Sequence, residues 1–154
     1  MFQYALGTEN GQAEIILNEN DEMTSFLTPI GSTKTIPRNR VAGKETVEVR
    51  RLDSIFDECI AGIDARNIYL KIDTQGYDIE VLWGAEGVLP QLKGAQTEVS
   101  FIPIYDGMLH YIESIREFEE RGFSVVDFMP VTRDDGGLLM VEMDCILARV
   151  PKKA

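Results

Sequence analysis

Residues 70–85, with the sequence LKIDTQGYDIEVLWGA, constrain the fold more than any other part of this chain. Apolar side chains recur at every second position up to Ile72, which is the period of a pleated strand. Asp73 follows at the expected carboxyl end of that strand, where open α/β sheets place their ligands. Gly76 allows the positive φ that a tight turn often needs, and Asp78 falls in the first turn of a predicted helix. The run therefore predicts a strand, a turn and a helix that bring an acid and an amide to one edge of a sheet.

Composition narrows the class of protein and its partners. The chain has 154 residues, 44% of them hydrophobic, which suits one globular domain over 1–154. A net charge of -11 argues against a nucleic-acid partner and an anionic membrane surface, because both need a basic face. No apolar run approaches the roughly 18 residues of a membrane span. Without a basic signal segment, and with Cys59 and Cys145 interpreted as free thiols, we expect a cytoplasmic protein. A single histidine predicts no His-rich metal site.

Strands and helices alternate through the middle of the chain. Strands are predicted over 2–6, 13–17, 46–50, 68–72, 97–102, 123–128 and 141–149, and helices over 53–63, 78–92 and 109–121. Asn10-Gly11 predicts a hairpin between the first two strands, and Pro90 should kink or split the second helix. In the third helix, Ile112, Ile115 and Phe118 are expected to face inward. The alternation predicts an α/β fold with a mostly parallel sheet, helices on its faces and an antiparallel final strand.

Residues 18–44 show neither period and are rich in Thr, Ser, Pro and Gly, which predicts a long loop. Basic residues are concentrated in and just after this loop: Lys34, Arg38, Arg40, Lys44, Arg50 and Arg51. One interpretation is a basic patch over an anionic substrate, and the other is an ordinary solvated loop. The second is the more common arrangement and is favoured here.

Several blocks of sequence carry a family resemblance. The main ones are ALG at 5–7 with NG at 10–11, VRRLD at 49–53 and the run at 70–85, with further support from EVS at 98–100, PIY at 103–105, RGF at 121–123 and Asp144. In these blocks and in their order, the chain resembles the FkbM-type methyltransferases, a branch of the Rossmann-like enzymes that use S-adenosylmethionine. The resemblance implies transfer of a methyl group from that cofactor to a hydroxyl of a small molecule or sugar.

The resemblance lacks the part of the family that holds the cofactor. The Gly-rich turn after a first strand and the acid after a second strand are not found, so the similarity is to the carboxyl-terminal part only. We expect a truncated product with an incomplete Rossmann-like sheet that binds S-adenosylmethionine weakly or not at all. An exposed sheet edge should then cause self-association into a homo-oligomer. The alternative function is a non-catalytic α/β module that associates with itself or with a partner.

Candidate acceptor-side residues follow the two central strands. Asp73 could orient or deprotonate the acceptor, hold a metal, or simply cap the turn, and Gln75 could orient a hydroxyl. Glu98 could share a proton or a cation with Asp73, or serve as a surface or core-capping residue. Tyr105 and Asp106 lie where acceptor contacts are common, or form a packed aromatic beside a turn acid.

On the cofactor side, the resemblance places the adenine ring beside Leu6 and Gly7. The rest of that site is missing from the sequence, so this role is expected to be vestigial. No metal ligand is predicted.

Overall fold

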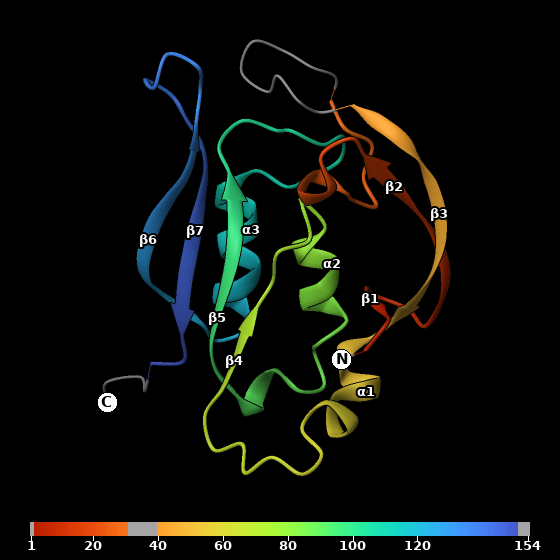
Figure 1. Cartoon of the computed structure of the whole chain (residues 1–154). Coiled ribbons are helices and arrows are strands. Elements are labelled where there is room, and N and C mark those ends of the chain that lie inside the picture. The colour runs from red at the N-terminus through yellow and green to blue at the C-terminus, as the bar shows by residue number, and fades with distance from the viewer. Residues whose placement is uncertain (1, 31–39, 151–154) are drawn as a thin grey trace.

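The computed structural model describes residues 2–30 and 40–150 as a mixed α/β structure with two sheets. Its strands are β1 (Ala5–Leu6), β2 (Gly11–Asn18), β3 (Val41–Arg50), β4 (Ile68–Lys71), β5 (Leu92–Ser100), β6 (Ser124–Arg133) and β7 (Met140–Ala148). Its α-helices are α1 (Leu52–Cys59), α2 (Asp78–Trp83) and α3 (Tyr111–Glu120), and two 3-10 turns are η1 (Asp21–Met23) and η2 (Leu89–Gln91). Figure 1 shows α2 between the two sheets and α3 behind β5.

The sheets are mixed, so the predicted mostly parallel sheet is wrong. One sheet has the order β1-β3-β2 and the other β4-β5-β7-β6. Among the described strands, the β1–β3 and β4–β5 pairs are parallel, whereas β2–β3, β5–β7 and β6–β7 are antiparallel. Residue alternation has the same period in both kinds of pair, so it could not reveal strand direction. The α/β class and the antiparallel final pair are confirmed.

The predicted hairpin between the first two strands is also wrong. β1 and β2 lie on opposite sides of β3 and do not pair with each other. Asn10 does not simply close a two-residue turn: its Oδ1 accepts hydrogen bonds from the backbone N of Arg51 at 2.7 Å and from Ser54 Oγ at 3.0 Å. The Asn-Gly pair therefore ties the start of β2 to the start of α1.

The predicted loop over 18–44 is shorter than expected at its carboxyl end. β3 begins at Val41, and η1 lies within the first part of the loop. Lys34 and Arg38 lie outside the described residues. Three other bases of the proposed patch pair with acids: Lys44 with Glu14, Arg50 with Glu48 and Arg51 with Asp53. Local pairing of these three cations argues against a free basic patch over an anionic substrate.

The helices differ from the predictions at their ends. α1 stops at Cys59, so Ile63 lies beyond it and is exposed. In the second predicted helix, α2 ends before Gly84 and Pro90 sits in the separate turn η2, which confirms the predicted split. On α3, Phe118 is fully buried, but Ile112 is exposed, contrary to the prediction that it faces inward.

One close backbone contact joins the three-stranded sheet to the end of α2. An ideal Cβ placed on Gly84 would lie 2.0 Å from the carbonyl oxygen of Gly7, so α2 and the end of β1 touch through backbone atoms alone. The same region is held by Arg51, whose guanidinium donates to Asp53 and to the carbonyl oxygen of Thr8 at 2.7 Å. Both features fix the end of β1 against the end of α2 and the start of α1.

Among the described residues, no helix has the length and apolar character needed to cross a membrane. Cys59 and Cys145 are both free thiols.

Candidate acceptor site

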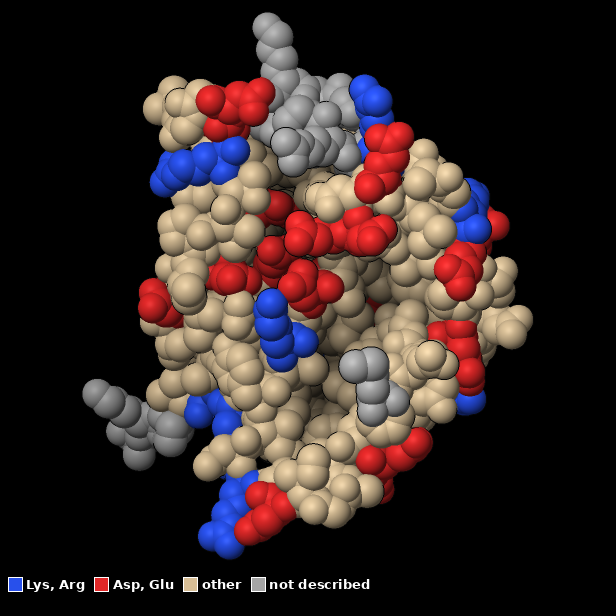
Figure 2. Space-filling view, viewed as in Figure 1, with Lys and Arg blue, Asp and Glu red and all other residues tan. Residues whose placement is uncertain are grey.

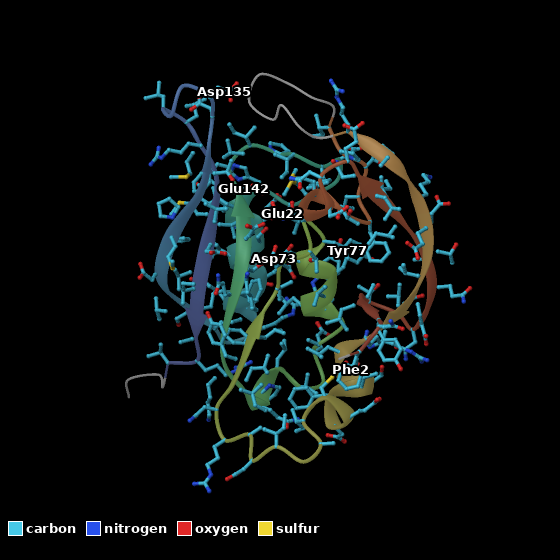
Figure 3. The ribbon with its side chains drawn as sticks, in the orientation of Figure 1. Phe2, Glu22, Asp73, Tyr77, Asp135 and Glu142 are labelled. Atoms are coloured by element: carbon cyan, nitrogen blue, oxygen red, sulfur yellow. The ribbon has the colours of Figure 1, made fainter. Side chains whose placement is uncertain are left out.

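An acidic cavity of about 520 Å³ lies beyond the carboxyl ends of β4 and β5. Its lining comes from η1, the loop after β4, and strands β5 to β7: Asp21, Glu22, Met23, Thr24, Asp73, Gln75, Glu98, Val131, Thr132 and Glu142. Figure 2 shows acidic side chains gathered at the centre of this face. In Figure 3, Glu22, Asp73 and Glu142 lie near one another, whereas Asp135 lies far away at the β6–β7 turn. Three predicted site residues, Asp73, Gln75 and Glu98, thus share one cavity.

The turn after β4 adopts an uncommon backbone. Gln75 has a φ of 51°, in the left-handed region, and Gly76 follows with a φ of 87°. A left-handed non-glycine residue costs free energy and persists only when its surroundings hold it. Ser25 is one such support: its buried hydroxyl donates to the carbonyl oxygen of Gln75 at 2.8 Å and accepts from the backbone N of Leu27 at 3.1 Å. The backbone of Gln75 is therefore held in place by a residue from the segment that follows η1.

The Gln75 side chain connects two other candidate residues. Its Nε2 lies 3.1 Å from Glu98 Oε2, and its Oε1 lies 3.2 Å from Tyr105 Oη. The tyrosine hydroxyl also lies 2.8 Å from the carbonyl oxygen of Met23 in η1. Acid, amide and phenol thus form one hydrogen-bonded row from the cavity into the interior.

Glu98 is surrounded by other acids. It stands directly opposite Asp144 of β7 in the antiparallel register, where like charges repel. Burial, followed by the charges of Glu142, Asp73, Asp78 and Asp144, raises the pKa of Glu98 to about 8. The carboxyl group is therefore mainly protonated at neutral pH.

Asp73 differs from Glu98 in exposure and pairing. Its side chain is 47% exposed, and its Oδ2 lies 2.9 Å from Lys71 Nζ. The ion pair lies on the solvent side, and the carboxylate still lines the cavity. Asp73 is thus a carboxylate that a ligand in the cavity can reach.

The two residues predicted to bind substrate occupy different positions. Tyr105 is 1% exposed, and burial raises the pKa of its hydroxyl above the usual range. Its ring packs beneath the turn, 3.2 Å from a Cβ placed on Gly76, so it supports the site from behind. Asp106 is exposed, does not line the cavity, and its backbone N donates to the carbonyl oxygen of Thr28 at 2.8 Å. The structure does not bring Asp106 to the other candidates.

Leu6 and Gly7, the residues expected beside the adenine ring, serve in packing. Leu6 packs against the main core, and Gly7 is buried with its backbone N donating to the carbonyl oxygen of Arg50 at 3.1 Å. A hollow of about 320 Å³ lies next to Gly7, lined by residues 8–13 with Val49 and Tyr77. Gly11 is the one glycine of its described lining, which holds no run of glycines of the kind that lets backbone approach a cofactor closely, so the hollow does not fit the whole of S-adenosylmethionine.

Three polar residues at this edge were not identified from sequence. Glu142 is buried in the cavity wall and accepts a hydrogen bond from Ser100 Oγ at 3.2 Å. Asp78, interpreted only as a helix-start acid, is buried and accepts from Thr97 Oγ1 at 2.8 Å, and burial raises its pKa. Ser25 lay in the predicted loop. The two acids in the predicted strand 141–149, Glu142 and Asp144, were the available signal for Glu142.

In the described part of the chain, no cluster of three or more His, Cys, Asp or Glu side chains is arranged to hold a metal ion.

Comparison with known proteins defines the class. The family model described as the methyltransferase FkbM domain matches residues 1–125, which is most of the chain. The chain therefore belongs to the FkbM methyltransferase family, as its motifs indicated. No curated protein and no solved structure matches it.

Proposed function

We propose that this chain binds the acceptor in methyl transfer from S-adenosylmethionine to a hydroxyl of a small molecule or sugar. The observation that carries the proposal is the position of Asp73, Gln75 and Glu98 around one cavity at the carboxyl ends of two parallel strands. Open α/β sheets bind ligands at this edge, and a cavity of about 520 Å³ has the size of a small-molecule site. The family match supports the reaction class.

The residues of the cavity suit the acceptor half of this reaction. S-adenosylmethionine, when bound, supplies an electrophilic methyl group. The chain's task is then to position the acceptor hydroxyl and to receive its proton. Asp73 is the proposed proton acceptor because, of the exposed carboxylates that line the cavity, it is the one that directly follows a parallel strand. Gln75 and Glu98 are proposed to orient the acceptor beside it, and Tyr105 to support them.

In the described residues, the binding site for the methyl donor is less complete than the acceptor cavity. Leu6 and Gly7 pack inward and the hollow beside them is smaller than the acidic cavity, so we expect weak binding of S-adenosylmethionine by the chain alone. Calorimetry that found a stoichiometric site with a Kd in the micromolar range or below would contradict this expectation.

Asp73→Asn should lower kcat/KM for methyl transfer by about 100-fold, because a positioned general base contributes roughly 10²–10⁴-fold. The assay supplies labelled S-adenosylmethionine at high concentration and a panel of hydroxyl acceptors. Asp64→Asn is the matched control, since Asp64 is an exposed acid paired with Arg66, far from the cavity lining. Equal turnover in both variants would remove Asp73 from the mechanism. No transfer to any hydroxyl would contradict the proposed function.

A second candidate function is self-association as a non-catalytic α/β module. It is favoured by the incomplete cofactor site and by the edge of β4, which has a described partner strand on one side only. Apolar side chains flank that edge, since Tyr69 and Ile63 are both exposed. The other edge strand, β6, is less suited to pairing because Pro130 lacks an N–H and three register shifts interrupt it.

We expect a dimer that pairs through the β4 edge. Light scattering should give twice the monomer mass, and Tyr69→Lys combined with Ile63→Lys should shift the chain to the monomer. Leu138→Lys is the control, because Leu138 is the most exposed of the large hydrophobics and lies at the β6–β7 turn. A monomeric wild-type chain at high concentration would exclude this assembly.

A further inference from the structure

We propose that Tyr105 acts through Gln75 as a positioning residue that holds Glu98 as a protonated hydrogen-bond donor. Asp73 is then the group that takes the acceptor's proton. The role of Asp73 rests on the proposed function, whereas the location of the proton on Glu98 follows from hydrogen-bond geometry in the chain itself.

The direction of the hydrogen-bonded row is set at its inner end. The carbonyl oxygen of Met23 can only accept, and Tyr105 Oη lies 2.8 Å from it. The hydroxyl has one proton, so a bond to Met23 leaves only a lone pair facing Gln75, 3.2 Å away. The side chain of Gln75 must therefore donate to Tyr105.

Only the amide nitrogen of Gln75 can make that donation. Rotating the amide by 180° exchanges its nitrogen and oxygen at nearly the same positions, and this places the oxygen toward Glu98 at a separation of about 3.1 Å. An amide oxygen facing a carboxylate would repel it, whereas a protonated carboxyl donates to it. In this arrangement Glu98 donates to Gln75, Gln75 donates to Tyr105, and Tyr105 donates to the carbonyl oxygen of Met23.

The opposite orientation satisfies fewer groups. With the nitrogen toward an ionised Glu98, the amide oxygen needs the single proton of Tyr105. The hydroxyl then gives up its shorter contact, the one with Met23, for a longer one. The first orientation keeps both contacts.

The charged groups facing Glu98 favour its protonated form. They are Glu142 and Asp144 from β7, Asp73 after β4, Asp78 from α2, and, across the cavity, Asp21 and Glu22 from η1. Lys71 of β4 is the one described cation nearby, and its ammonium is bound to Asp73. The raised pKa of Glu98, about 8, agrees with this environment.

The two acids then have different tasks. The proton of Glu98 is committed to Gln75, so Glu98 cannot serve as the base, and its second oxygen remains free to accept a hydrogen bond from the ligand. Paired acids whose environments separate their protonation states commonly divide acid and base roles in this way.

Carbon-detected NMR on chain labelled at the Glu side-chain carboxyl tests the proposal without an acceptor. Wild-type Glu98 should titrate with a midpoint of about 8. In Tyr105→Phe the amide is free to turn its nitrogen to the carboxylate, so the midpoint should fall by about one pH unit or more. Tyr4→Phe, which keeps the ring that stacks under Arg50, should leave the midpoint unchanged.

Gln75→Met should shift the titration midpoint of Glu98 in opposite directions for the two orientations of the Gln75 amide. If the amide oxygen accepts from Glu98, its loss removes support for the protonated form and lowers the midpoint. If the nitrogen donates to a carboxylate, its loss raises the midpoint. A rise in Gln75→Met, a wild-type midpoint below about 6, or equal midpoints in Tyr105→Phe and Tyr4→Phe would overturn the proposal. Absent methyl transfer would overturn the proposed function but not the proton's position.

Discussion

Gly84→Ala is expected to lower the free energy of unfolding by about 3 kcal/mol or more, because no side chain fits at this contact. A Cβ at Gly84 would lie 2.0 Å from the carbonyl oxygen of Gly7 and 2.9 Å from its carbonyl carbon. Both atoms belong to the backbone, so relief requires moving β1 away from α2. That movement would also disturb Asp53, whose backbone N donates to the carbonyl oxygen of Gly84 at 3.1 Å.

Urea denaturation followed by circular dichroism measures this loss directly. For a chain of this length, about 3 kcal/mol corresponds to a decrease in Tm of roughly 6–12 °C. Gly43→Ala is the matched control, because a Cβ at Gly43 in β3 meets nothing within 4 Å. Equal stability of the two variants would show that β1 and α2 are not in backbone contact.

Phe118→Ala should destabilise the chain by about 3–5 kcal/mol, since it removes a large buried ring and leaves a cavity. Phe118 of α3 is 0% exposed and belongs to the main core cluster. Its ring packs edge-on against the ring of Phe123, the residue just before β6, with 6.0 Å between the ring centroids. The substitution thus loosens α3 from the four-stranded sheet.

Ile112→Ala on the same helix is the control for Phe118→Ala. Ile112 is 48% exposed, and we expect its truncation to cost about 1 kcal/mol or less. Chemical denaturation of the two variants under the same conditions compares them. A loss at Ile112 as large as that at Phe118 would mean that the opposite face of α3 is buried in an interface.

The local part of the site could be predicted from sequence. Alternation up to Ile72 located β4, and the acid, amide and glycine after it indicated a turn at the edge of a sheet. Asp73, Gln75 and Glu98 lie around one cavity because β4 and β5 are adjacent and parallel, so their carboxyl ends meet. Their roles in catalysis remain predictions.

The non-local part could not be predicted. Residue period does not tell which strands pair, so neither the β1-β3-β2 order nor the choice of β5 as a partner of the antiparallel final strand β7 was foreseen. Ser25 and the carbonyl oxygen of Met23 come from a segment without a regular pattern, and they reach the turn only through tertiary structure. Ile112 was wrongly predicted to face inward. Apolar residues lie on more than one side of this helix, so their spacing did not define a single buried face.

The supports of Gln75 also affect how the site forms and fails. Ser25 holds Gln75 across 50 positions of sequence, and Met23 is joined to Tyr105 across 82. We expect such distant contacts to form late in folding, because closing a long loop costs more conformational entropy than forming a local contact. A local opening that frees residues 23–27 would dismantle the cavity and leave the β4-β5-β7-β6 sheet intact. The competent site is therefore a property of the fully docked native state and is absent from partly folded forms that retain most of the secondary structure.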